Sequence, residues 1–143
     1  FNHYSYGAVE EWMMEYSAGI QRDESHPAYK HFYLQPRVGG RFNYIHASYN
    51  SMYGRISSAW DSSNRNPDID DASKYGYTYR AVVPANTTAT LQLPVPDHAR
   101  LKMVKGKKGI IAHQENTGNS QFELGSGNYE FKVIFPVSLT VSK

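Results

Sequence analysis

The sequence predicts a mainly β protein, in which an antiparallel β-sandwich is preceded by one α-helix. Apolar residues recur at every second position in several stretches between residues 29 and 135, which is typical of half-buried strands. Clusters of Gly, Pro, Asn and Asp separate these stretches, as they do in a sandwich or barrel of short strands. Only the first twenty residues have the three-and-four spacing of a helical face.

The helix is expected over residues 5–20. Its apolar residues share one face: Val9, Trp12, Met13, Tyr16 and Ile20. Asn2 or Ser5 can cap its start, because a side-chain oxygen there accepts a hydrogen bond from an unpaired backbone amide. Gly19 suits the left-handed residue with which many helices end.

Five alternating stretches are the predicted strands: residues 29–36, 42–45, 75–83, 89–93 and 129–135. Turn clusters fall at residues 84–86, 106–109, 118–119 and 125–128, and the polar residues 61–73 read as a long loop. Aromatic rings pack well on pleated surfaces, so most of the twelve tyrosines are expected in the β core.

The chain is expected to divide into residues 1–26, the helix with its connector, and residues 27–143, the sandwich. A helix that is apolar on one side needs a second layer to cover it. The simplest interpretation is that it closes an all-helical domain that precedes Phe1, and the alternative is that it packs across the sandwich. Without the preceding domain, the exposed apolar face favours self-association of the chain.

Composition excludes several classes of function. The chain has no cysteine, which excludes disulfides, cysteine-ligated metals and a thiol nucleophile. For the same reason the chain can fold in oxidising and in reducing compartments. A net charge of +2, from 15 Lys+Arg and 13 Asp+Glu, is too small and scattered to indicate a nucleic-acid partner. No apolar run approaches the roughly 18 residues of a membrane span. We therefore expect neither nucleic-acid nor membrane binding.

The carboxylates indicate no catalytic pair. Glu11 and Glu15 lie four residues apart and read as a solvated helix face. The acidic residues 68–71 lack the glycine of a calcium loop and read as a polar loop. Residues 106–109 read as a hairpin turn with two solvated lysines and lack the spacing of a phosphate loop. Exposed aromatic side chains can stack on sugar rings, so a carbohydrate-binding face is an alternative function.

Six histidines are spread singly along the chain: His3, His26, His31, His46, His98 and His113. None has the spacing that places two imidazoles on one side of a metal ion, so no metal site is predicted. His31 and His46 are expected to be packed or hydrogen-bonded at the edge of the core. His3 precedes the helix among aromatic residues and is a candidate to line a cleft and bind a polar ligand.

Two groups of segments resemble one family, in the family's order. Four segments resemble the last barrel helix of the bacterial α-L-rhamnosidases, glycoside hydrolase family 78: Asn2-His3-Tyr4, Tyr6-Gly7-Ala8-Val9, Glu11-Trp12-Met13 and Ala18-Gly19-Ile20. Others resemble the tail domain of the same enzymes: Tyr29-Lys30-His31-Phe32, Ala47-Ser48-Tyr49, Ser51-Met52-Tyr53-Gly54, Pro84-Ala85-Asn86-Thr87-Thr88-Ala89 and Gly125-Ser126-Gly127-Asn128-Tyr129-Glu130-Phe131. The resemblance covers essentially the whole chain.

The resemblance implies a multidomain parent enzyme, in which an (α/α)6 catalytic barrel is followed by a C-terminal antiparallel β-sandwich. Such enzymes hydrolyse terminal α-L-rhamnosides with inversion and without a cofactor, using an acid and a base carboxylate roughly 6.5–9.5 Å apart. In the family both carboxylates come earlier in the barrel, so they are expected upstream of Phe1, and this chain carries no catalytic residue. The predicted helix is then the last helix of that barrel.

Two substrate-binding residues carry over from the family. His3 matches a histidine that contacts the bound rhamnose, and a neutral imidazole offers one donor and one acceptor to sugar hydroxyls. Asn2, which is next to His3, is expected to act as a positioning and helix-capping residue. The expected partners are a rhamnose-containing glycoside in the full-length enzyme and the enzyme's own barrel. The fragment is expected to be structural and inactive alone; the alternative is a carbohydrate-binding accessory module that uses exposed aromatic residues.

Overall fold

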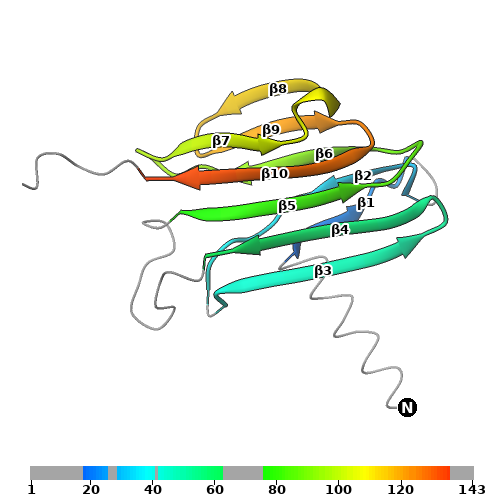
Figure 1. Ribbon diagram of the computed structural model, residues 1–143, viewed down its shortest axis with the longest axis horizontal. Coiled ribbons are helices and arrows are strands. Elements are labelled where there is room, and N and C mark those ends of the chain that lie inside the picture. Colours follow the sequence, from blue (N-terminus) through cyan, green and yellow to red (C-terminus); the bar gives the residue numbers. More distant parts are fainter. Residues whose placement is uncertain (1–17, 26–28, 41, 63–75, 136–143) are drawn as a thin grey trace, which may run out of the picture.

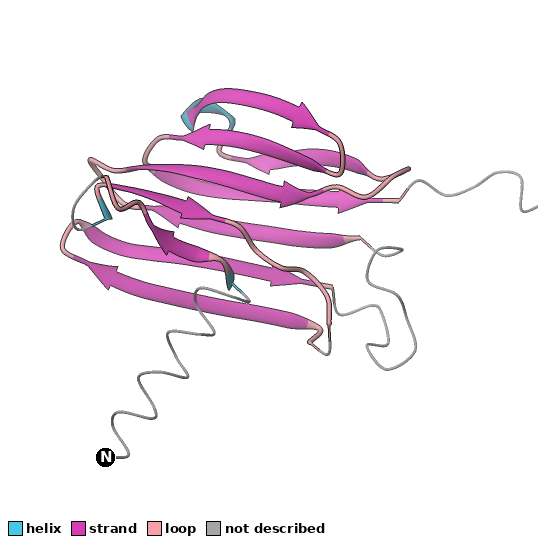
Figure 2. Cartoon of the chain, turned by 180° about the vertical axis from the view of Figure 1, so that it is seen from behind, coloured by secondary structure: helices cyan, strands magenta, loops and turns pink. Residues whose placement is uncertain are grey.

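In a computed structural model, the chain forms a sandwich of two five-stranded β-sheets (Figure 1). The structure describes residues 18–25, 29–40, 42–62 and 76–135. These residues are almost entirely strands joined by short turns (Figure 2). The prediction of a mainly β fold is confirmed. The predicted helix falls almost wholly on residues 1–17, and the predicted polar loop largely on residues 63–75; both segments lie outside the described residues.

Sheet A has the strand order β1-β2-β6-β9-β8. Its strands are β1 (Ile20–Arg22), β2 (His31–Leu34), β6 (Thr88–Pro94), β9 (Asn119–Leu124) and β8 (Ile110–Asn116). Neighbouring strands are antiparallel except β2 and β6, which are parallel. The predicted antiparallel sandwich is thus corrected at one pair, because β2 reaches β6 through a long connection by way of the other sheet.

Sheet B has the strand order β3-β4-β5-β10-β7 and is antiparallel throughout. Its strands are β3 (Tyr44–Ser51), β4 (Gly54–Asp61), β5 (Tyr77–Val83), β10 (Gly127–Ile134) and β7 (Arg100–Lys105). The 3-10 turn Lys107–Gly109 joins β7 to β8 and so crosses from sheet B to sheet A. The hairpin predicted at residues 106–109 is therefore wrong, although its two lysines are exposed as expected.

Ile20, predicted to end the helix, instead begins β1, which pairs with β2. Gly19 does adopt the predicted left-handed conformation, with φ 75. A Cβ atom there would lie 2.1 Å from the carbonyl carbon of Gln35, whose amide donates a 2.9 Å hydrogen bond to the Gly19 carbonyl oxygen. Glycine is thus required for the close approach of two backbones. The sheet includes residues before position 27, and the division of the chain at residues 26 and 27 remains a prediction.

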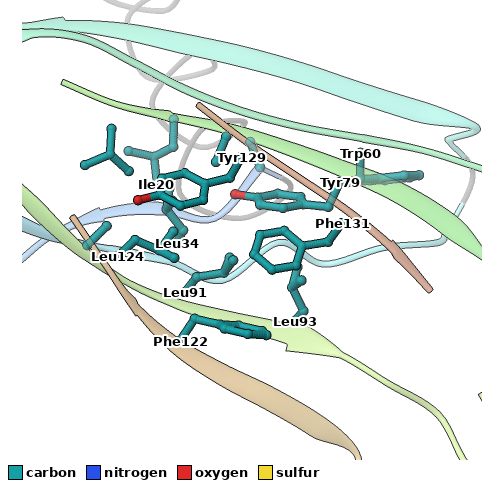
Figure 3. Packing of buried hydrophobic residues seen from close by; sticks show 14 of the residues in the cluster. Ile20, Leu34, Trp60, Tyr79, Leu91, Leu93, Phe122, Leu124, Tyr129 and Phe131 are labelled. Atoms are coloured by element: carbon teal, nitrogen blue, oxygen red, sulfur yellow. The ribbon is translucent and has the colours of Figure 1, made fainter. Parts of the chain in front are cut away.

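The core lies between the two sheets and is built from their inward-facing residues. From sheet A come Phe32, Leu34, Leu91, Leu93, Phe122 and Leu124, and from sheet B come Ile56, Trp60, Tyr79, Phe131 and Val133. The rings of Phe122 and Phe131 meet across the two sheets with centroids 4.8 Å apart (Figure 3). Burial of these side chains is the main source of the fold's stability.

The tyrosines are less buried than predicted. Of the eight tyrosines in the described ranges, only Tyr77, Tyr79 and Tyr129 are buried. In β2 and β3 the residues that face the core are Phe32, Leu34 and Ile45, and the tyrosines that alternate with them point outward. Because a phenol carries a hydroxyl that needs a partner, phenylalanine and aliphatic residues take the inner positions there.

Candidate functional site

The outer face of sheet B carries a shallow trough that runs along β4 between β3 and β5. Ile45, Trp60 and Tyr79 point into the core, so their neighbours in sequence point outward. Strand pairing then sets Tyr44 opposite Asp61 and Asp61 opposite Thr78. A second row places His46 beside Ala59 and Ala59 beside Arg80.

The depth of this trough results from the small side chains on β4. Ala59 and Ser57 are short, whereas His46 and Arg80, which flank Ala59 on β3 and β5, are longer. They enclose a cavity of about 280 Å³, whose outward-facing residues are Tyr44, His46, Ser57, Ala59, Asp61, Thr78, Arg80 and Val82. We call this cavity the β4 trough.

The charges around the β4 trough are nearly balanced. Arg80 Nε donates to Glu130 Oε1 on the neighbouring strand β10 at 3.1 Å. Asp61 lies at the end of the trough and is the only carboxylate among its described lining residues. Tyr44 is 65% exposed, so a large part of its surface is open to solvent. The trough can hold a small polar ligand that has an apolar face, and its described residues offer one of the two carboxylates that acid–base hydrolysis needs.

A second polar cluster lies on the outer face of sheet A, around His31. Its Nδ1 lies 2.6 Å from the Thr88 hydroxyl and its Nε2 lies 2.9 Å from the Thr90 hydroxyl. The Thr90 hydroxyl donates to Glu123 Oε1 at 2.8 Å and therefore accepts from Nε2–H; in a neutral imidazole Nδ1 then accepts from the Thr88 hydroxyl. Both ring nitrogens are engaged, so the cluster clamps the parallel strands β2 and β6 together. The prediction that His31 is hydrogen-bonded at the core edge is confirmed.

A second cavity, of about 370 Å³, is lined by Gln35, Pro36, Arg37, Val38, Gln92, Pro94, Gly118 and Asn119. It lies where β6 ends and β9 begins, and none of its lining residues is acidic. Within the described ranges, no three His, Asp or Glu residues come close enough together to hold a metal ion. No helix there is long and apolar enough to span a membrane.

The predicted substrate-binding residues, His3 and Asn2, lie outside the described residues, as do Glu11 and Glu15 and the acidic residues 68–71. His46 was expected at the core edge; it is exposed and lines the β4 trough instead. No sequence pattern predicted Tyr44, Asp61 or Arg80 as site residues. The available signal was the small pair Ser57 and Ala59 at outward positions of a strand, but their neighbours across the sheet depend on the strand pairing.

The described residues thus define a two-layer β-sandwich domain with a polar trough on one outer face. Residues 19–108 match the family described as the bacterial alpha-L-rhamnosidase C-terminal domain. Because this match spans more than half of the chain, the chain belongs to that family.

Two characterised proteins with the name alpha-L-rhamnosidase are similar to the chain. The protein of Streptomyces avermitilis is 33% identical over 133 residues, which cover 93% of this chain and 11% of that protein. The protein of Formosa agariphila is 31% identical over 102 residues, which cover 71% of this chain and 10% of that protein. The chain therefore spans about a tenth of the length of these relatives.

The fold is also similar to part of a solved structure. The crystal structure of the Streptomyces avermitilis alpha-L-rhamnosidase complexed with L-rhamnose matches with a TM-score of 0.62 and 28% identity. The match covers 90% of this chain and 11% of that one. In these relatives the sandwich is a small part of a much larger protein.

Proposed function

We propose that this chain is the structural C-terminal domain of an α-L-rhamnosidase-like glycoside hydrolase, which packs on the enzyme's catalytic (α/α)6 barrel and is inactive by itself. The parent enzyme hydrolyses terminal α-L-rhamnosides with inversion. The observation that carries this proposal is the family match over residues 19–108, together with the small share of each relative that the chain spans.

The cavities support a non-catalytic role. An inverting glycosidase needs two carboxyl groups on opposite sides of the scissile bond, roughly 6.5–9.5 Å apart. Among the described residues that line the two cavities, only Asp61 carries a carboxylate. We place the acid and the base in the barrel, upstream of Phe1. In the assembled enzyme His3 hydrogen-bonds the rhamnose, and Asn2 is the positioning residue beside His3.

The surface that packs on the barrel is the end of the edge strand β3 nearest Met52. The Ser58 hydroxyl on β4 donates a 2.7 Å hydrogen bond to the Ala18 carbonyl oxygen, so the first described residue lies against β4. Tyr49 on β3 is 37% exposed, and Met52 at the turn after it is 78% exposed. An edge strand with exposed apolar side chains needs a partner to cover it.

The test is an assay on an aryl α-L-rhamnoside with two proteins: this chain, and the longer enzyme that includes the preceding barrel. We expect turnover by the longer enzyme only. Robust turnover by the chain alone would contradict the proposal. In the longer enzyme, His3→Ala should raise KM or abolish turnover, because a hydrogen bond to the sugar is lost.

A second candidate function is carbohydrate binding by the sandwich itself, through exposed aromatic residues. The observation that favours it is the exposed Tyr44 at the β4 trough.

A further inference from the structure

We propose that the β4 trough binds one sugar unit of a neutral saccharide, which stacks on the ring of Tyr44. This assignment rests on the second candidate function and gives it a site. The trough lies on the outer face of sheet B, and Tyr44 is at the opposite end of β3 from Met52, which marks the proposed barrel interface.

Tyr44 supplies the apolar contact. One face of a pyranose ring is lined with C–H bonds, and such a face packs on an aromatic ring while the hydroxyls remain solvated or hydrogen-bonded. Tyr44 is 65% exposed on the outer face of an edge strand, where its ring forms a wall of the trough. An aromatic ring that is so exposed within a cavity is better placed to bind a ligand than to pack in the core.

The cross-strand row next to Tyr44, formed by His46, Ala59 and Arg80, leaves space for the sugar ring. β3 and β5 are separated by β4, so their backbones lie about 10 Å apart. Between His46 on β3 and Arg80 on β5 stands only the methyl group of Ala59. A flat ring can therefore lie over Ala59 with polar groups on both sides.

The polar groups match hydroxyls better than anions. The Arg80 guanidinium is paired with Glu130, which neutralises its charge but uses one of its five N–H donors in the observed bond. His46 offers a donor and an acceptor, Thr78 offers a hydroxyl, and Asp61 contributes acceptor oxygens. A ligand that carries many hydroxyls and no charge uses both kinds of group, whereas an anion meets an Arg80 guanidinium that is already paired with Glu130.

The size of the trough sets the expected affinity. Its volume of about 280 Å³ is near the lower end of the range for small-molecule sites and suits a single sugar unit. A shallow, open site with few anchoring groups gives a dissociation constant on the order of 1 mM.

The experiment is a titration of the isotopically labelled chain, followed by NMR, with oligosaccharides from a neutral L-rhamnose polymer. Cello-oligosaccharides serve as a second neutral probe and oligogalacturonate as an anionic one. We expect saturable shifts at β3, β4 and β5 with at least one neutral probe and none with oligogalacturonate. Tyr44→Ala should weaken binding about tenfold, because the stacking contact is lost. Ala59→Leu should weaken it as much, because the leucine fills the floor of the trough.

Two matched controls lie on the opposite sheet. Ile111, on the edge strand β8, is also 65% exposed, and Ile111→Ala should leave binding unchanged. Ala112→Leu repeats the alanine-to-leucine change at an exposed position of β8 and should likewise have no effect. Thermal unfolding of all four variants verifies that each remains folded.

Three results would overturn the proposal. Binding that survives both Tyr44→Ala and Ala59→Leu would place the saccharide elsewhere, and stronger binding of oligogalacturonate would contradict a neutral ligand; both leave the second candidate function standing. No shift with any of the saccharides at tens of millimolar would remove the proposal and the second candidate function together. None of these results bears on packing against the barrel, which the rhamnosidase assay tests separately.

Discussion

The hydroxyl of Ser58, buried on the inner face of β4, donates a 2.7 Å hydrogen bond to the carbonyl oxygen of Ala18. The same hydroxyl lies 2.7 Å from the hydroxyl of Tyr79, which must donate to it because the proton of Ser58 is already used. This short chain of hydrogen bonds joins the first described residue to sheet B within the apolar core. It therefore holds the N-terminal edge of the sandwich in place.

Ser58→Ala should lower the free energy of unfolding by about 1–3 kcal/mol, because it leaves the Ala18 carbonyl and the Tyr79 hydroxyl buried without this partner. Urea denaturation of the chain measures the effect. Ser57→Ala is the matched control, since Ser57 is the adjacent residue on the outer face and should change stability by less than about 0.5 kcal/mol. Equal midpoints for the two variants would show that the hydrogen-bonded chain contributes nothing.

Gly109→Ala should destabilise the chain by about 1–3 kcal/mol through a steric clash. A Cβ atom at Gly109 would lie 2.0 Å from the Tyr129 hydroxyl oxygen, and that hydroxyl is held by a 2.6 Å hydrogen bond to the Gly125 carbonyl. Gly125→Ala is the control, because its nearest neighbour would be a backbone oxygen at an ordinary 3.4 Å. Thermal denaturation should show a lowered midpoint for the first variant only, and the reverse order would refute the explanation.

The chain should lose stability as the pH rises above about 10. Burial raises the pKa of Tyr77, of Tyr79 and of Tyr129 above the ordinary value for tyrosine, 10.0. Below pH 10 both states keep these protons, so stability is unaffected. Above it the unfolded chain releases them first, and the free energy of unfolding then falls by up to about 1.4 kcal/mol per pH unit for each such group.

Denaturation curves between pH 8 and pH 11.5 measure this slope. Tyr79→Phe should make it shallower, because one buried phenol is gone. The control is Tyr44→Phe, which removes a phenol from the exposed outer face. A slope that is the same for both variants would rule out the buried tyrosines as its source.

His31→Leu should lower stability by about 1–2 kcal/mol, because it removes both hydrogen bonds between β2 and β6 that involve this side chain. Hydrogen exchange should be accelerated most in β2, since β2 pairs with β6 through only four residues. His46→Leu makes the same change on β3, where the side chain is exposed, and should leave exchange in β2 unaltered. Protection of β2 that survives in His31→Leu would count against the clamp.

Met52→Lys should destabilise the longer enzyme while leaving this chain unchanged. In the chain Met52 is 78% exposed, so a lysine there is solvated. If β3 packs on the barrel, the same lysine becomes buried without a partner, which is unfavourable. Thermal unfolding of both proteins decides this, with Ile111→Lys on the opposite edge strand β8 as the control that should be neutral in both. Equal effects of the two lysines in the longer enzyme would place the interface elsewhere.

Strands with large apolar residues on one face were predictable from the sequence. β5, β6 and β10 lie close to the predicted stretches 75–83, 89–93 and 129–135, because their inward residues are buried against the other sheet. β8 was missed because six of its seven residues are exposed, which leaves no alternation to detect. β4 was missed because one of its inward positions is Ser58, a polar residue whose burial depends on Ala18 and Tyr79.

The candidate site likewise combines features that the sequence predicts with contacts that depend on the fold. His46 and its outward neighbours are visible in the sequence as polar positions of a strand, yet nothing local indicates that Ala59 separates His46 from Arg80. Those contacts join residues of three strands, two of which are linked by residues 62–76. Only the register of the strands brings them together.

The sequence by itself determined the mainly β class, the inward faces of the regular strands, the exclusion of cysteine chemistry and the resemblance to the α-L-rhamnosidase tail. The tertiary structure alone decided that β1 begins at Ile20, that β2 and β6 are parallel, that the turn at residues 107–109 crosses between sheets, and that a trough lies along β4. The physical reason is that alternation reports which face of a strand is buried, a local property of each residue. Which strand lies next to it is settled by packing across the whole core.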